Sequence, residues 1–285
     1  MSILTWIIVL TTLAGVGGTG LGGVVGAILH KDSNRIVSLL LSFAGGVMLA
    51  VVCFDLIPSA LHPDDSSAIS PFIVIAGVLF GYIVVYLLNF LIDRGTNHEV
   101  RHANTAAHPK TADDLDELIH SDHYAEHKKE KNHSHLFVAG VVMAAAIALH
   151  NLPEGMVIGA SFANTTVPNM FSGSGLILAI IIGLHNIPEG MAVSVPLISG
   201  GMKQSKAILV TALSGVPTVL GALLGYWLGA VGPMGLCLSL SFASGAMLYV
   251  VLGELMPEAI LMWRSKLPAF ATLVGLLLGL LLMYV

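Results

Sequence analysis

Two strongly apolar runs of this chain carry the same seven-residue phrase: residues 136–160 read LFVAGVVMAAAIALHNLPEGMVIGA, and residues 173–199 read GSGLILAIIIGLHNIPEGMAVSVPLIS. Each run is long enough to cross about 30 Å of hydrocarbon as a helix. In both phrases a histidine and a glutamate stand four residues apart, so they share one face of that helix. Because a charged side chain at bilayer depth costs about 2.5–3.5 kcal/mol, four such polar groups in two spans indicate a functional site.

The remainder of the chain also has the composition of a membrane protein. Of its 285 residues, 55% are apolar and only 10% are charged, whereas roughly a quarter of the residues in a soluble domain are charged. Apolar runs of membrane-spanning length recur along the chain and predict an all-α integral membrane protein with eight transmembrane helices. The runs cover residues 4–29, 36–60, 71–92, 136–160, 173–199, 205–230, 233–258 and 267–285.

The basic residues predict how the chain crosses the bilayer. All 12 Lys and Arg fall in or at the edge of the first, third, fifth and seventh loops between these runs, and the other loops hold none. The positive-inside rule places the odd loops in the cytoplasm and both termini on the extracytoplasmic side. An even number of spans agrees with that orientation.

The first three spans resemble the last three. Residues 41–49 read LSFAGGVML and residues 240–248 read LSFASGAML, and the DLIP of residues 55–58 recurs as ELMP at residues 254–257. The charge pattern makes the two copies run in opposite directions. This predicts an inverted repeat, spans 1–3 against spans 6–8, in a 3+2+3 arrangement with the two signature spans at its centre.

We divide the chain into four parts of one transport domain: residues 1–92 with spans 1–3, residues 93–135, residues 136–199 with spans 4–5, and residues 200–285 with spans 6–8. The part from 93 to 135 is a polar cytoplasmic loop that we expect to be disordered. It either collects metal ions loosely or is a plain solvated linker. Its eight histidines are His98, His102, His108, His120, His123, His127, His133 and His135.

The charge balance at the two phrases favours a bound cation. Apart from Lys206, at the edge of the run 205–230, no Lys or Arg lies in a predicted span, so no fixed basic residue can neutralise Glu154 and Glu189. Protonated carboxyls, cationic histidines or a bound cation remain, and a divalent metal satisfies both glutamates together with His150 and His185. Because histidine ligands argue against Mg²⁺ and Ca²⁺, which prefer oxygen, the candidates are Zn²⁺, Fe²⁺, Mn²⁺, Co²⁺ and Cd²⁺.

Each phrase also has a proline between its histidine and its glutamate. Pro153 and Pro188 cannot donate a hydrogen bond to the carbonyl four residues back, so we expect a kink in each helix. Interrupted helices at membrane depth line a cavity rather than face lipid. The prolines therefore agree with a site between the spans.

Other polar residues are candidates with open roles. Asn151 and Asn186 either bind the metal, surround its ligands or hydrogen-bond between helices. Asp55 and Glu254, near the outer and inner ends of their spans, suit an uptake and release relay, or they are ordinary helix-end carboxylates. Three weaker pathway candidates have plainer alternatives, core packing for the methionine and a membrane-edge location for the other two: Met48, Glu258 and His62.

At these residues the chain resembles the ZIP (Zrt-, Irt-like protein) family of divalent-metal transporters, and within it the prokaryotic GufA-like branch. The resemblance covers nearly the whole chain: eight spans, a His-rich cytoplasmic loop after the third, and HNxPEG phrases in the fourth and fifth. It implies metal uptake toward the cytoplasm, often as a homodimer, through a central site. The family's primary metal ligands are matched by His150, Glu154, His185 and Glu189.

The resemblance also implies a second, adjacent metal position, matched by Asn151 and Asn186 with the two glutamates bridging. Relatives often complete it with a glutamate in the sixth span, where this chain has Thr218. A threonine hydroxyl is a poor, neutral substitute for a carboxylate. We therefore expect the second position to be weak or absent.

These observations predict a transporter, not an enzyme, that moves divalent transition-metal ions into the cytoplasm through a midplane site, Zn²⁺ foremost and Cd²⁺, Fe²⁺ or Mn²⁺ as alternatives. An intramembrane zinc metallohydrolase, for which no separate general base stands out, and a metal sensor or receptor are the rival functions. We expect no organic cofactor, no nucleic-acid partner, and a multi-pass location in a bacterial inner membrane. Glycine pairs permit close helix packing within the chain or in a homodimer: Gly77 with Gly81, and Gly275 with Gly279.

Overall fold

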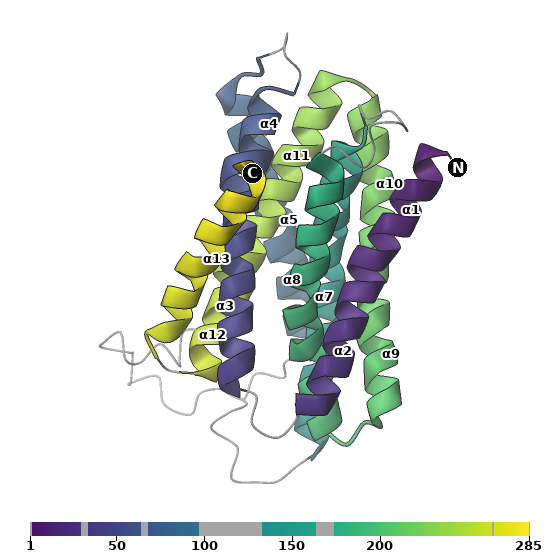
Figure 1. The fold of residues 1–285 in the computed structure, drawn as a ribbon, viewed down its shortest axis with the longest axis vertical. Coiled ribbons are helices and arrows are strands. Elements are labelled where there is room, and N and C mark those ends of the chain that lie inside the picture. The colour runs from purple at the N-terminus through teal and green to yellow at the C-terminus, as the bar shows by residue number, and fades with distance from the viewer. Residues whose placement is uncertain are drawn as a thin grey trace.

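A computed structural model describes residues 2–29, 34–63, 68–96, 133–163, 174–263 and 265–284 of the chain. All regular elements in these ranges are helices, which confirms the predicted all-α class. Figure 1 shows them as an upright bundle whose N-terminal and C-terminal helices have their free ends at the same end of the bundle.

Each predicted apolar run is helical, four as one continuous helix and four divided into shorter segments. Three of these segments, designated η, have the wider π-helical turn. The segments are α1 (Ile3–Thr12), η1 (Leu13–Gly17), α2 (Gly18–Leu29), α3 (Asn34–Val51), η2 (Val52–Leu56), α4 (Ile57–Leu61), α5 (Pro71–Thr96), α7 (His133–Ser161), α8 (Ser174–Ser199), α9 (Gln204–Ser214), α10 (Val216–Ala230), α11 (Pro233–Tyr249), η5 (Val250–Leu255), α12 (Met256–Met262) and α13 (Leu267–Tyr284).

Seven stretches of the described chain are helical, long enough and apolar enough to cross a membrane. The helix of the predicted fourth span, α7, has 29 residues but is not among the seven. The seven are Ile3–Ile28, Arg35–Leu61, Pro71–Leu91, Gly175–Ser199, Gln204–Ala230, Pro233–Met262 and Leu267–Tyr284.

Glycines bring four pairs of helices into backbone contact. In the α2–α8 pair a Cβ atom on Gly22 would overlap the Ile187 carbonyl, and in the α7–α10 pair a Cβ atom on Gly155 would overlap the Thr218 carbonyl. Helix backbones approach this closely only where no side chain separates them. The corresponding contacts in the other two pairs are Gly46 with Thr272 between α3 and α13, and Gly245 with Val78 between α11 and α5.

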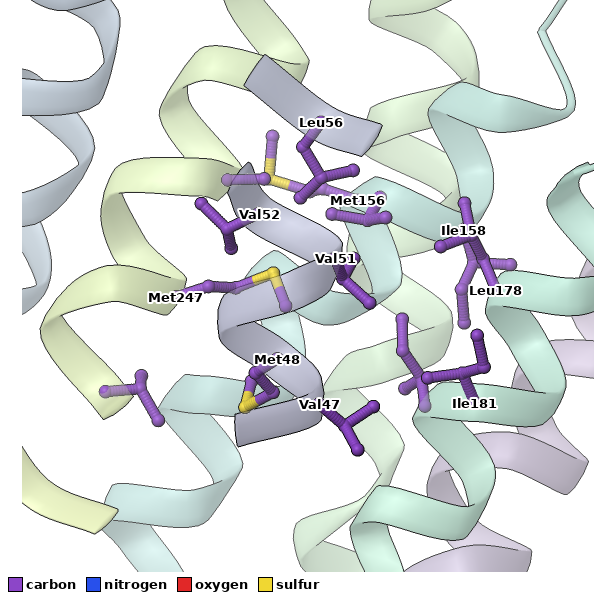
Figure 2. Packing of buried hydrophobic residues seen from close by; sticks show 14 of the residues in the cluster. Val47, Met48, Val51, Val52, Leu56, Met156, Ile158, Leu178, Ile181 and Met247 are labelled. Atoms are coloured by element: carbon purple, nitrogen blue, oxygen red, sulfur yellow. The ribbon is translucent and has the colours of Figure 1, made fainter. Parts of the chain in front are cut away.

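A layer of apolar side chains lies between these pairs. The α2–α8 and α7–α10 pairs contact each other through α7 and α8, while α3–α13 and α5–α11 form the other side. Figure 2 shows the buried side chains where α3 and α11 meet α7 and α8. Those labelled are Val47, Met48, Val51, Val52, Leu56, Met156, Ile158, Leu178, Ile181 and Met247.

Two of the π-helical turns, η2 and η5, have a common cause. Each is followed by a proline near the start of the next helix, Pro58 in α4 and Pro257 in α12. Proline offers no N–H to the carbonyl four residues back, so the helix widens by one residue at that point. The two turns contain Asp55 and Glu254, which places the two predicted relay carboxylates at matching positions.

Candidate metal centre

Three of the four predicted primary ligands converge between α7 and α8. The His185 Nε2 atom lies 3.0 Å from Glu189 Oε1, one turn along α8, and 3.5 Å from Glu154 Oε1 on α7. One ligand atom from each residue lies within 4.8 Å of the others. The i, i+4 spacing of the phrase therefore brings His185 and Glu189 together on α8. The contact between α7 and α8 brings Glu154 to them.

The cluster has unused acceptors and no local positive charge to neutralise it. Glu154 and Glu189 are fully buried. Among the described residues, neither Glu154 carboxylate oxygen has a hydrogen-bond partner, and the same holds for Glu189 Oε2 and His185 Nδ1. The runs that carry the cluster, 136–160 and 173–199, contain no Lys or Arg. Buried charges are stable only when paired or bound to a metal, and one imidazole nitrogen with two carboxylates is a donor set that suits Zn²⁺.

His150 does not join this cluster. Its Nε2 atom lies 2.6 Å from Glu254 Oε2 on η5, and the two side chains are 3% and 17% exposed. Their other polar atoms, His150 Nδ1 and Glu254 Oε1, are without a hydrogen-bond partner. This contact joins α7 to the other side of the apolar layer, and it gives Glu254 a position beside the cluster's fourth expected ligand.

The two asparagines hydrogen-bond between helices, which is one of the three roles expected for them. The Asn151 side-chain amide donates to the Ser214 carbonyl at 2.9 Å, and the Asn186 amide donates to the Ala14 carbonyl at 3.1 Å. Both residues are fully buried, and both side-chain carbonyl oxygens are left without a partner.

Thr218 lies on α10 and is fully buried. Its hydroxyl has no hydrogen-bond partner and is turned toward the first span, because a Cβ atom built on Gly15 would lie 2.5 Å from Thr218 Oγ1. Its counterpart in the repeat, Thr19, donates instead to the Gly15 carbonyl within its own helix at 2.9 Å.

The remaining predicted residues occupy varied environments. Met48 is buried in the apolar layer, Asp55 is half-buried, and His62 is exposed at the end of α4. Pro153 and Pro188 lie inside α7 and α8, both of which continue past them. Glu258 belongs to α12. Of the histidines of the loop, His133 and His135 lie in the first turn of α7, and the others lie outside the described residues: His98, His102, His108, His120, His123 and His127.

Two features of the site were not predicted from the sequence. One is the contact between His150 and Glu254, which depends on the relative height of α7 and η5. The other is the interruption of the first and sixth spans opposite the asparagines. The repeat offset of 199 residues, which relates Thr19 to Thr218, was a usable signal that both interruptions would fall at the same point.

Helices of membrane length around a buried His/Glu cluster define a multi-pass integral membrane protein that handles a cation. The chain belongs to the ZIP zinc transporter family, because the family profile described as ZIP zinc transporter matches residues 2–285. This confirms the resemblance inferred from the HNxPEG phrases. Membership makes the chain a transporter of divalent metal ions rather than an enzyme, and it removes the metallohydrolase alternative.

Individual relatives agree over nearly the full chain. A protein named zinc transporter ZupT from Campylobacter jejuni is 34% identical over 98% of this chain and 94% of its own length. Proteins of the same name from Lysinibacillus sphaericus, 33% identical over 88% of this chain and 86% of theirs, and from Chlorobium luteolum, 32% identical over 88% and 87%, are similarly related.

Proposed function

We propose that this protein carries divalent transition-metal ions, Zn²⁺ foremost and Cd²⁺, Fe²⁺ or Mn²⁺ as further substrates, into the cytoplasm through the cluster of Glu154, His185 and Glu189. The observation that carries the proposal is the burial of two carboxylates and an imidazole with unused acceptor atoms. A divalent cation entering from water exchanges hydration oxygens for these ligands. His150 is the fourth primary ligand, and it reaches the ion when it leaves Glu254.

The pathway proposed on either side of the cluster uses the carboxylates of the two π-helical turns. Asp55 receives the ion on the outer side and Glu254 on the inner side, with Met48, His62 and Glu258 as further contacts. Support comes from the 2.6 Å contact between His150 and Glu254. Because His150 is a proposed metal ligand, this contact places the Glu254 carboxylate next to a ligand of the centre. Ligands of this kind must select an ion and still release it.

The proposed topology has eight spans in a 3+2+3 inverted repeat, with both termini outside the cytoplasm. Four facts support it. The helix α7 has 29 residues, about 43 Å at 1.5 Å per residue. The terminal helices have their free ends at one end of the bundle (Figure 1). The inverted repeat equates spans 1, 2 and 3 with spans 6, 7 and 8, and span 4 with span 5. The contact α2–α8 then corresponds to α10–α7, and the contact α3–α13 corresponds to α11–α5. The same correspondence relates η2 to η5.

We propose that one ion dominates at the centre. Asn151 and Asn186 contribute oxygen to a second position beside the glutamates, but Thr218 offers it only a neutral hydroxyl. Isothermal titration of the purified protein with Zn²⁺ is expected to give one tight site per chain, and two sites of comparable affinity would contradict this.

The proposed setting is the inner membrane of a bacterium, with lipid around the bundle, a homodimer as the assembly, and a His-rich loop that collects metal at the cytoplasmic side. Support for the bacterial membrane is the bacterial origin of the ZupT relatives. The predicted glycine pairs pack within the chain, Gly77 and Gly81 against α11 and Gly275 and Gly279 against α3.

The function is tested by metal flux into proteoliposomes that contain a metal-responsive dye. Wild-type protein is compared with the double variant His185→Ala/Glu189→Ala and with Thr272→Ala, a buried control on α13 whose hydroxyl bonds only its own helix. Selective flux in the wild type and the control, lost in the double variant, is expected. Zinc binding without flux in the wild type would point to the sensor function.

A further inference from the structure

The interruptions of the first and sixth spans meet at one point of the bundle. The first span changes to a π-helical turn at η1, and the sixth divides at Gly215 between α9 and α10. A Cβ atom on Gly15 would lie 2.5 Å from the Gly215 carbonyl oxygen, and one on Gly215 would lie 2.5 Å from the Gly15 carbonyl oxygen. The two interrupted backbones therefore touch, each with a glycine at the contact.

The sixth span leaves a carbonyl without a helical partner. The N–H that would bond the Ser214 carbonyl in a continuous α-helix is that of Thr218, and it bonds to the Gly215 carbonyl at 3.2 Å instead. A buried carbonyl needs a partner. The Asn151 amide supplies it at 2.9 Å.

The first span is contacted in a similar way by the other signature phrase, although the carbonyl involved also accepts from the N–H of Gly18 within the span. The Asn186 amide donates to the Ala14 carbonyl, inside η1, at 3.1 Å. Each asparagine directly follows a histidine of the site, and the Asn186 side chain also lies beside Glu154. An Asn amide has two N–H donors and one oxygen acceptor, so one bond to the interrupted helix leaves its second N–H and its oxygen for the site. Both of these oxygens are buried and unpaired.

We propose that Asn151 and Asn186 are positioning residues. Their amide N–H groups hydrogen-bond the interrupted sixth and first spans to the helices that carry the metal ligands, and we call this pair of hydrogen bonds the fastening. The fastening fixes the orientation of the asparagine oxygens at the metal centre. This inference rests on the proposed function for its consequence, but the fastening itself is a property of the protein without metal.

The test replaces each asparagine by aspartate, which keeps an oxygen, loses the N–H donors and adds a negative charge, and by alanine, which loses both donor and acceptor without adding charge. Backbone hydrogen exchange is followed in the detergent-solubilised protein at residues 13–18 and 212–218. Asn151 variants are expected to exchange about tenfold faster at 212–218 only, and Asn186 variants at 13–18 only, as loss of one buried hydrogen bond allows. Each variant is thus the control for the other.

Matched controls remove a buried hydroxyl that bonds only within its own helix: Thr11→Ala in the first span and Thr211→Ala in the sixth. They are expected to leave exchange at both interruptions unchanged. In flux measurements the aspartate variants are expected to lower Vmax about tenfold with a smaller change in KM, because an oxygen ligand is retained while the fastening is lost.

Two results would overturn the inference. Unchanged exchange in both the aspartate and alanine variants would show that the asparagines act as oxygen ligands only. Faster exchange at both interruptions in every variant would show general loss of stability. If the wild-type protein neither binds nor carries zinc, the proposed function fails, and the exchange data still decide whether the fastening exists.

Discussion

His150 and Glu254 form a contact of 2.6 Å that takes His150 away from the other three ligands. At the scale of single residues, this contact predicts the behaviour of Glu254→Gln, which removes the charge and keeps the shape. His150 is then free to join Glu154, His185 and Glu189, so we expect zinc to be held about tenfold more tightly and released more slowly, since each charge-assisted hydrogen bond is worth about 1.5–3 kcal/mol. Dye-competition titration and flux measurements on the same preparation test this, with Thr272→Ala as control. Weaker zinc binding in the Glu254 variant would count against the exchange of His150 between two partners.

The ligand types at the centre also predict how zinc binding depends on pH. Histidine and carboxylate must both be deprotonated to bind a metal, so protons and zinc compete for the same atoms. We expect zinc affinity to fall as the pH is lowered from neutral to mildly acidic values. Competition titrations with a chelator of known pH response measure this, and a flat profile would exclude histidine as a ligand.

At the scale of helices, the glycine contacts predict which substitutions the bundle tolerates. Gly155→Ala would place a Cβ atom against the Thr218 carbonyl, whereas at Gly17 a Cβ atom would meet only the Thr12 carbonyl oxygen, at 3.8 Å. Overpacking of this kind costs about 1–3 kcal/mol. Thermal unfolding in detergent should therefore show a clear loss of stability for Gly155→Ala and a much smaller one for Gly17→Ala. Equal shifts in both would contradict the backbone contact.

Much of the helical structure could be predicted from the sequence because long apolar runs in a membrane protein have few alternatives to helix. The predicted run 71–92 became Pro71–Thr96, and 173–199 became Ser174–Ser199. The π-helical turns could not be predicted in this way, because an apolar run has the same hydrophobicity whether its turns are α-helical or are widened by one residue. The site was predictable where residues share a phrase, as His185 and Glu189 do. It was not predictable where two distant segments set the contact, as for His150 and Glu254.

At the scale of the whole molecule, the proposed orientation predicts which surfaces a reagent can reach. Ser70 follows the second span and Lys203 precedes α9, and α4 and α9 lie at opposite ends of the bundle (Figure 1). In a protein whose two cysteines, Cys53 and Cys237, are replaced by alanine, we expect Ser70→Cys to react with an impermeant thiol reagent in intact cells. Lys203→Cys should react only after the membrane is opened. The reverse pattern would invert the orientation and the direction of transport.

The two kinds of helix contact described above differ in mechanical stiffness. Where backbones touch at glycine, as at Gly22 and Gly221, no rotamer can change to absorb a displacement, so these pairs resist shear. The side chains labelled in Figure 2 are valine, leucine, isoleucine and three methionines, and the unbranched thioether chains adapt to altered surroundings at low cost. We therefore expect elastic deformation to be concentrated in the methionine-containing layer, which borders the helices that carry the metal ligands.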